Sequence, residues 1–598
     1  MNSTASEIVQ IALNSECATL VTTDIWNGNS TNHGKVYFLG AWCFSSRHDE
    51  KKARLAGTII QYHWNNRTKL KEDFELLGKL NEDLLDELSV VLNQLHGRSE
   101  DKIFWRLLLG YWLNIYTTVV FDRWASLKEA LEHRINWKTE VHLIDDQLLV
   151  AADTAEFIKM ATESSQWNHS LFAIIARYYP KINISLEVKS SVSVRMPIIP
   201  IPHASFKQQI RDKLGNFLNY FKFRDRYFLI DTYLPRKKIA ALEMSLGQLP
   251  FPRFDISRSR NFNFDPNCRK WSLPVHAIND EFGLIVRELL PRFLPHVFIE
   301  GFRDLMSRTN ELPWPRSPKV IFTSNQHFSN DTFKAWAAQK VAKGSRLVIG
   351  EHGGMGVGLF NGSHRYELSV ADAYLSTGWT DSNHGNIVPL GYFRSVQRKI
   401  KLRSTGKALL VCGLMPRFSF DVRAMILSGQ VLDYFEDQFC FVDALPKDIQ
   451  NQILVRLYSK DYGWEQKERW LDRHPKIQFD NGQKSMLDTA SKCRLFIGSY
   501  MATTYIESLV SNIPTVMFWN PVNWEVKQEA QPFFDKLRDV GIFHESAKEA
   551  ALHISTIWAD IPSWWNSDKV QSVRKYFCDH YAATPADIGK RLKKVLIE

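Results

Sequence analysis

The sequence predicts an α/β protein with two Rossmann-like domains that face a cleft and an added helical region near the N-terminus. A chain of 598 residues is too long for a single hydrophobic core. From Lys319 onward, short β-branched runs alternate with helical segments, which is typical of parallel sheets covered by helices on both faces. We expect an N-terminal region with the helical insertion (1–140), a first Rossmann-like domain (141–400) and a second one with terminal helices (401–598).

The helical region is predicted by two long stretches, 70–95 and 103–131, in which apolar residues recur at three- and four-residue spacing. The apolar run 107–120 lies in the second stretch and is interrupted by Asn114. This pattern indicates a buried helix, because a membrane span needs about 18 uninterrupted apolar residues. A short strand is expected earlier in the chain, at 36–40.

Two series of short apolar runs predict the strands of the two Rossmann-like domains. The first series is 228–233, 320–323, 346–350, 373–376 and 387–390. The second series follows a charged linker at 398–407 and consists of 408–412, 453–458, 495–498 and 515–519. Parallel sheets of this kind bind ligands outside the carboxyl ends of their strands. Two of them joined near residue 400 therefore predict a binding cleft between domains.

The composition excludes several classes of protein. The net charge of +10 includes no run of five Lys or Arg, so we expect no nucleic-acid partner but anionic small ligands or an anionic membrane surface. The seven cysteines are scattered and form no C-x-x-C pair, which predicts no disulfide framework, no bound metal and no other cofactor. The first thirty residues lack the apolar core of a secretory signal, so a cytoplasmic location is expected.

A glycine-rich loop directly after the strand at 346–350 is the first candidate site. Gly353 and Gly354 let backbone N–H groups approach an anion or a sugar, so they are candidate ligand-binding residues. Glu351 and His352 stand at the mouth of the loop and are candidate catalytic residues. The spacing is neither a Walker loop nor G-x-G-x-x-G. The alternative is a tight turn with a capping histidine, but the position at a strand end favours function.

Four other acidic or histidine residues near the predicted strand ends fall into two groups, one catalytic candidate and three surface or capping residues. Asp231 ends the strand predicted at 228–233 and is a second candidate for a catalytic carboxylate or base. His364, Glu367 and Asp372 follow the glycine-rich loop, on what we expect to be the next helix. They are interpreted as surface or capping residues.

A hydroxyl-rich turn after Gly498 is the second candidate site. Ser499, Thr503 and Thr504 can donate hydrogen bonds to phosphate oxygens at the positive end of the helix that follows. Glu507, one turn into this helix, can accept hydrogen bonds from ribose hydroxyls. A hydroxyl N-cap is common in helices of any function, so a purely structural cap is the alternative. The glutamate and the Asn-Ile-Pro before the next strand favour the nucleotide site.

Three further residues are candidates for contacts with the nucleotide. Arg417 and Arg456 follow or end predicted strands, where a guanidinium is suited to a bidentate phosphate contact. His474, in a His-Pro pair, lies before the next short strand. For each of them, a solvated or salt-bridged role is as consistent with the sequence as a role in binding.

Several of these segments resemble one family. The residues that carry the resemblance are 37–43, 62–64, 351–354, 493–521 and 541–544. They are similar to transferases encoded in gene clusters for O-antigen and other surface polysaccharides, over nearly the whole chain. The resemblance implies a place in bacterial surface-polysaccharide synthesis more than it implies a particular reaction.

A more distant resemblance implies glycosyl transfer. Two-Rossmann (GT-B type) transferases that use CMP-activated acidic sugars, the Kdo and sialic-acid transferases, hold CMP with a His-Pro element and a Ser/Thr-rich turn. His474-Pro475 and 499–504 resemble that pair. In the Kdo enzymes the His-Pro directly ends a strand, whereas this chain has Arg456-Leu457-Tyr458 there. Many related transferases use UDP or GDP sugars, so the donor base stays open.

The resemblance thus implies a metal-independent glycosyltransferase with its nucleotide on the second domain. Its expected partners are a nucleotide-sugar donor and a lipid-linked or growing polysaccharide acceptor, with peripheral contact at the cytoplasmic face of the inner membrane. Two alternatives remain at this point. One is a non-catalytic nucleotide- or glycan-binding component of a polysaccharide assembly complex, and the other is a transferase that modifies sugars with a non-glycosyl group.

Overall fold

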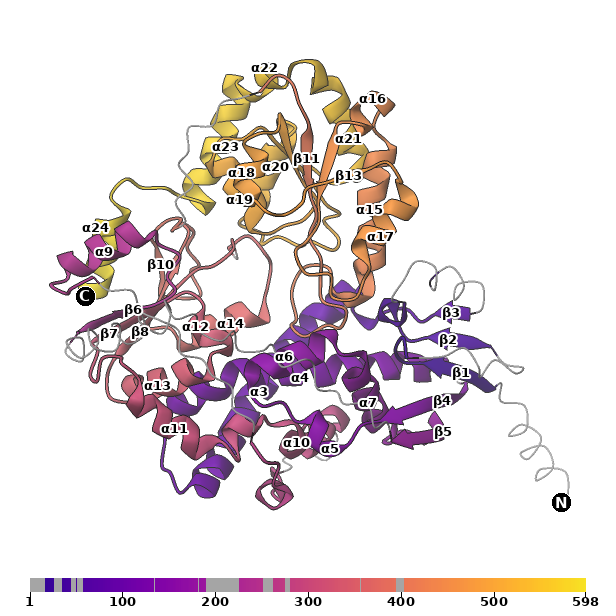
Figure 1. Cartoon of the computed structure of the whole chain (residues 1–598), viewed down its shortest axis with the longest axis vertical. Coiled ribbons are helices and arrows are strands. Elements are labelled where there is room, and N and C mark those ends of the chain that lie inside the picture. Colours follow the sequence, from indigo (N-terminus) through magenta and orange to yellow (C-terminus); the bar gives the residue numbers. More distant parts are fainter. Residues whose placement is uncertain are drawn as a thin grey trace, which may run out of the picture.

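The computed structural model describes residues 17–25, 35–44, 50, 57–133, 135–180, 182–189, 225–250, 262–274, 280–354, 356–393 and 403–598. Within these residues the chain forms three parallel β-sheets, which we call the N-terminal, middle and C-terminal sheets. Figure 1 shows the C-terminal sheet at the top and the other two below it, on either side of a central group of helices.

The N-terminal sheet is an addition that the sequence analysis does not predict. Its strands, in the spatial order β3-β2-β1-β4-β5, are β1 (Cys17–Val21), β2 (Val36–Phe38), β3 (Gly57–Ile59), β4 (Asn136–Leu143) and β5 (Ile182–Lys189). Two of these strands have only three residues, and two long helices separate β3 from β4, so no regular alternation marks them. The boundary expected at residue 140 falls inside β4, so it does not separate two structural units.

Two long helices, α3 (Arg67–His96) and α4 (Lys102–Glu132), confirm the predicted helical region. Asn66 caps α3 by accepting a hydrogen bond from the Lys69 N–H, and Gly97 ends it in the left-handed conformation (φ 61°). Helix α4 packs against α3 and against helices of the middle domain. It is buried along most of its length, as its apolar run requires. The shorter helices of this region are α5 (Asp146–Leu149), α6 (Thr154–Glu163) and α7 (Ser165–Ala176).

The middle sheet belongs to the first Rossmann-like domain. Its strands, in the order β10-β9-β8-β7-β6, are β6 (Tyr227–Leu229), β7 (Val320–Thr323), β8 (Arg346–Gly350), β9 (Ala373–Ser376) and β10 (Ile387–Pro389). Its helices are α9 (Arg236–Ser245), α10 (Glu281–Phe293), α11 (Phe302–Glu311), α12 (Gln326–Ser329), α13 (Asp331–Val341) and α14 (Gly362–Val370). The strands β7 and β9 are completely buried and β8 is buried except for Arg346, which explains their nearly continuous apolar sequence.

The C-terminal sheet belongs to the second Rossmann-like domain. Its strands, in the order β13-β12-β11-β14-β15-β16, are β11 (Ala408–Val411), β12 (Ile453–Arg456), β13 (Gln478–Phe479), β14 (Leu495–Gly498), β15 (Thr515–Phe518) and β16 (Phe543–His544). Its helices are α15 (Val431–Asp443), α16 (Lys447–Gln450), α17 (Gln466–Arg473), α18 (Met486–Ala490), α19 (Thr503–Val510), α20 (Gln531–Asp539), α21 (Ala547–Ile557), α22 (Ile561–Trp565) and α23 (Asp568–Tyr581). The middle and C-terminal sheets are separate, so the predicted pair of Rossmann-like domains is confirmed.

The last helix, α24 (Ile588–Ile597), returns to the middle domain. Its apolar residues Ile588, Leu592 and Leu596 share a core with Leu229 of β6, and Figure 1 shows α24 beside α9, far from the C-terminal sheet. The sequence predicts this helix as part of the second domain, but its apolar face packs on the middle domain instead. Among all helices in the described residues, none combines the length and the apolar character needed to cross a bilayer.

Candidate functional site

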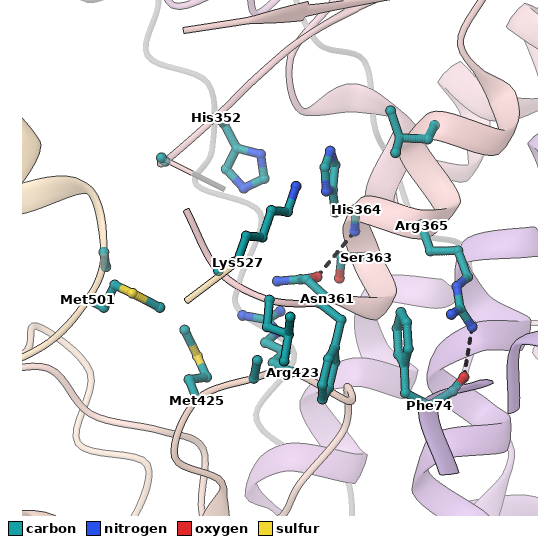
Figure 2. A pocket seen from close by; sticks show the side chains of 18 of the residues that line it. Phe74, His352, Asn361, Ser363, His364, Arg365, Arg423, Met425, Met501 and Lys527 are labelled. Carbon is teal, nitrogen blue, oxygen red and sulfur yellow. Dashed lines mark hydrogen bonds between the residues drawn. The ribbon is translucent and has the colours of Figure 1, made fainter. Parts of the chain in front are cut away.

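A cavity of about 840 Å³ lies where the two Rossmann-like domains and the central helices meet. Its walls come from α3 and α4, from the loops after β8 and β9, from α14, and from the C-terminal domain near residues 423–425, 501–503 and 527. Figure 2 shows His352, His364 and Lys527 on one side of it and Arg423, Met425 and Phe74 on another. The cavity therefore lies outside the carboxyl ends of the middle strands, as expected for sheets of this kind.

The glycine-rich loop and the hydroxyl-rich turn meet at one wall of this cavity. Gly353 (φ 85°) and Gly354 (φ 72°) both have left-handed backbone conformations that favour glycine. A Cβ atom on Gly353 would lie 2.9 Å from Thr503 Oγ1, and one on Gly354 would lie 2.2 Å from Ile506 Cδ1. The two glycines thus allow the backbone of the middle domain to pass directly against the start of α19.

The N-terminus of α19 opens onto the cavity without a capping side chain. Its N-cap residue is Ala502, so the sequence alternative of a hydroxyl cap does not hold. Ala502 and Thr503 both line the cavity. Thr504 Oγ1 is buried and forms no hydrogen bond within the described residues. Glu507 lies outside the cavity lining, where one carboxylate oxygen is 3.4 Å from the hydroxyl of Tyr392.

Ser499 does not face the cavity, which corrects its expected role. The residue is 1% exposed, and its hydroxyl donates to the carbonyl oxygen of Val411 at 3.0 Å and lies 2.9 Å from the Tyr434 hydroxyl. Gly498 ends β14 beneath it and packs against Phe496. These two residues hold the turn against the sheet, and only the residues that follow line the cavity.

Glu351 is a buried carboxylate whose oxygen atoms already accept three hydrogen bonds. The donors are the Thr377 N–H and Trp379 Nε1, both at 2.8 Å, and the Gly356 N–H at 3.3 Å. The side chain does not line the cavity. This geometry assigns Glu351 to holding the glycine-rich loop onto the loop after β9, in contrast to the catalytic role expected from the sequence.

His352 projects into the cavity and has a buried carboxylate behind it. Its Nδ1 lies 3.8 Å from an oxygen of Glu367, a residue of α14 with no exposed surface. His327 Nε2 lies 3.0 Å from the same oxygen. Burial alone would raise the pKa of Glu367, but His327 and His352 hold it at about 2. The interpretation of Glu367 as a surface or capping residue is therefore wrong.

The neighbours of Glu367 in the sequence also differ from expectation. His364 lines the cavity, burial lowers its pKa to about 4, and its Nε2 is a buried atom without a hydrogen-bond partner in the described chain. Asp372 accepts a hydrogen bond from the Leu347 N–H and so aligns β8 with the start of β9. Of the three residues, two lie at or behind the cavity wall.

Asp231 lies at the carboxyl end of β6, outside the cavity lining. It is an exposed residue with a left-handed backbone (φ 50°), and Tyr233 has the same unusual conformation (φ 59°). The Tyr233 ring stacks toward His352 with a centroid distance of 6.5 Å. Strained non-glycine residues cluster at functional sites, but here it is Tyr233 that contacts the cavity residue His352.

Arg417, Arg456 and His474 do not line the cavity. Arg417 is buried and pairs with Asp24 of the N-terminal region at 2.9 Å. Arg456 forms an ion pair with Asp480. His474 ends α17 near the amino ends of the strands, the edge opposite to the cavity. The salt-bridged alternative therefore describes these residues better than direct nucleotide contact.

Cationic side chains that the sequence analysis missed give the cavity a positive charge. Lys71, Arg365, Arg423 and Lys527 line it, against the two carboxylates Glu75 and Asp381. Arg365 pairs with Glu75 at 2.9 Å, Lys527 lies 3.8 Å from Asp381, and Arg423 Nε donates to Asp421 at 3.0 Å. Arg423 and Lys527 follow the carboxyl ends of β11 and β15, which is the signal that could have found them.

Fold and site together define a two-domain α/β protein with a cationic interdomain cavity suited to an anionic ligand. The profile of the LIC12162 family transferase matches residues 18–596, so the chain belongs to this family and is a transferase. A comparison with curated protein sequences finds no match. Among the described residues, no three or more His, Cys, Asp or Glu side chains form a group that could hold a metal ion.

Several solved structures are similar to parts of this chain. MurG from Acinetobacter baumannii is 9% identical, with coverage of 50% of this chain and 77% of MurG and a TM-score of 0.29. WaaG, a glycosyltransferase involved in lipopolysaccharide biosynthesis, is 11% identical, with coverage of 62% and 99% and a TM-score of 0.30. S. aureus MnaA with UDP is 11% identical, with coverage of 61% and 94% and a TM-score of 0.32.

Proposed function

We propose that this transferase moves a sugar from a nucleotide-activated donor to a surface-polysaccharide acceptor. The observation that supports it is the convergence of three features in one cavity: the uncapped start of α19, the glycine-rich loop and an imidazole backed by a carboxylate. A volume of about 840 Å³ is within the range of sites that enclose a small ligand. A nucleotide sugar presents both an anion for the helix and an anomeric carbon for chemistry.

In this proposal the donor phosphates bind at the N-terminus of α19. The first N–H groups of a helix have no partner inside the helix, and the helix dipole favours an anion beside them. The Thr503 hydroxyl adds a hydrogen bond, and Lys527 and Arg423 add positive charge. Glu507 reaches the ribose only if the nucleoside extends along α19 toward Tyr392.

His352 is the proposed general base. Its Nε2 takes the proton of an acceptor hydroxyl while that oxygen forms a bond to the anomeric carbon of the donor sugar. The bond between the anomeric carbon and the donor phosphate breaks in the same step, and the leaving phosphate keeps the electron pair. The N–H groups of α19 stabilise the charge on this phosphate. A single displacement of this kind inverts the anomeric configuration.

The finer assignments are part of the same proposal. A CMP-linked Kdo or related acidic sugar is a candidate donor, and a lipid-linked or growing polysaccharide is the acceptor. Peripheral contact with the inner membrane is supported by α9 and α24, which lie side by side and carry seven Lys or Arg residues against the single acid Glu243. Such a basic surface attracts anionic lipids.

A nucleotide panel tests the proposal. We expect one of CMP, UDP, GDP and dTDP to raise the melting temperature, because a ligand that binds only the folded state stabilises it. We expect His352→Ala to abolish turnover of the matching nucleotide sugar with nucleotide affinity retained. His133→Ala, at an exposed histidine beside the N-terminal sheet, is the matched control. Binding of none of the four nucleotides, or full turnover by His352→Ala, would contradict the proposal.

A further inference from the structure

The carboxylate of Glu367 is buried between two histidines that both approach one of its oxygen atoms. His327 Nε2 is 3.0 Å from Oε1, within hydrogen-bond distance. His352 Nδ1 is 3.8 Å from the same atom, which is too far for a hydrogen bond. Glu367 Oε2 and His352 Nδ1 are both buried, and neither has a hydrogen-bond partner in the described part of the chain.

Glu367 is a negatively charged group inside the protein. Its pKa of about 2 means that the carboxylate is ionised at neutral pH despite its burial. Burial lowers the pKa of His327, so this histidine is neutral and donates a hydrogen bond from Nε2. One neutral donor leaves most of the acceptor capacity of a carboxylate unused. His352 Nδ1, at 3.8 Å from Oε1, is an unpartnered nitrogen near this carboxylate.

A small shift of His352 toward Glu367 would bring Nδ1 within hydrogen-bond distance of the carboxylate. His352 precedes Gly353 and Gly354, whose conformations are accessible to glycine at low cost. On its other side the Phe328 ring meets the imidazole edge to face, with a centroid distance of 5.1 Å. Hydrogen bonds of catalytic groups are often long in the absence of substrate and shorten when the site is filled.

We propose that Glu367 is a positioning residue for His352: when a nucleotide fills the cavity, His352 Nδ1–H donates to the Glu367 carboxylate. This bond fixes the tautomer with the proton on Nδ1 and leaves the Nε2 lone pair directed into the cavity. The carboxylate also stabilises the imidazolium that forms when Nε2 accepts the proton of the acceptor hydroxyl. The inference rests on the proposed function, because it requires His352 to act as the base.

A purely structural role is the competing explanation. In that case Glu367 only anchors His327 and α12, and its replacement changes stability without changing the chemistry at His352. The chain offers a matched control for this explanation. Glu300 is another buried carboxylate with a pKa of about 2; it lies 3.1 Å from His296 Nδ1, also pairs with Arg269, and does not line the cavity.

The kinetic experiment compares Glu367→Gln with Glu300→Gln at equal folded fraction, checked by melting temperature. We expect Glu367→Gln to lower kcat about 100-fold or more with KM within about threefold, because general-base catalysis contributes roughly 10²–10⁴ to a rate. Glu300→Gln should melt lower and keep kcat. A Glu367→Gln variant with the kcat of the parent would overturn the inference.

A spectroscopic experiment on the parent protein covers the case in which Glu367→Gln does not fold. Histidine-selective ¹⁵N labelling reports which ring nitrogen of His352 carries the proton, with and without saturating CMP or UDP, whichever binds more tightly. We expect the Nδ1–H tautomer in the nucleotide-bound protein. The Nε2–H tautomer in that state would overturn the inference.

The failures of the two proposals are distinguishable. If the parent turns over no nucleotide sugar but binds the nucleotide with His352 in the Nδ1–H tautomer, glycosyl transfer is wrong and the positioning by Glu367 stands. If the parent is active, His352→Ala is inactive and Glu367→Gln is fully active, the proposed function stands and the positioning role is wrong. If none of the nucleotides binds, both are wrong.

Discussion

Replacement of Glu351 separates the role expected from the sequence from the role that the structure assigns. In Glu351→Ala, the Thr377 N–H and Trp379 Nε1 both lose an acceptor at 2.8 Å, and the Gly356 N–H loses one at 3.3 Å. A hydrogen bond to a charged group contributes about 1.5–3 kcal/mol, so the two short bonds alone predict a loss of roughly 3–6 kcal/mol. Oε2 of Glu351 accepts both short bonds, so the amide oxygen of Glu351→Gln can accept both of them without the charge. Charged hydrogen bonds are roughly twice as strong as neutral ones, so this variant should lose about half of that.

The assay is thermal unfolding together with turnover at a temperature at which every variant is folded. One kcal/mol corresponds to about 2–4 °C for a domain of 150–250 residues, so Glu351→Gln should melt roughly 3–12 °C lower. Its turnover should fall only as far as the loosened loop weakens nucleotide binding. A Glu351→Gln variant that melts like the parent but has lost turnover would refute the structural assignment and restore the catalytic one.

Three further changes test other parts of the site. Gly354→Ala should melt lower and bind nucleotide more weakly. The backbone of Gly354 is left-handed, and a Cβ atom there would lie 2.2 Å from Ile506 Cδ1 of α19. Melting and affinity like those of the parent would contradict this. Thr503→Val should weaken nucleotide binding about tenfold at an unchanged melting temperature. Ser499→Ala should instead lower the melting temperature and leave nucleotide affinity unchanged. Equal effects of the two variants would contradict the placement of the phosphates. Lys590→Glu with Arg591→Glu should reduce binding to vesicles of anionic lipid at least tenfold at low salt, since each basic residue near such a surface contributes about 1 kcal/mol; unchanged binding would exclude α24 as the contact.

The local elements of this protein follow closely from its sequence. Helices α3 and α4 and the strands from β7 to β15 named by the apolar runs are present near the predicted positions. The spacing of apolar residues shows which face of a helix or strand is buried, and this spacing can be read from neighbouring residues alone. In the N-terminal sheet, β2 lies at the strand predicted at 36–40, but the other four strands were missed, because parallel pairing joins segments that are separated by long crossovers.

The functional interpretation of single side chains depended on partners that are distant in the sequence. Glu351 and Glu367 are both acidic residues near the same glycine-rich loop, yet Glu351 is fully engaged by N–H donors while Glu367 backs His352. Arg417 has the strand-end position of a phosphate ligand, but Asp24 from the other end of the chain pairs with it. No local sequence pattern distinguishes a charged side chain that is paired with a distant residue from one that is free to bind a ligand.

The sequence by itself determined the class of fold, the two Rossmann-like domains and the two loops that meet at the cavity. These properties depend on hydrophobic period and on glycine and hydroxyl residues at strand ends, which are written in consecutive residues. Only the tertiary structure decided that Thr503 faces the cavity while Ser499 does not, and that α24 packs on the middle sheet. Those outcomes depend on which groups compete for each hydrogen bond and each apolar surface once distant segments pack together.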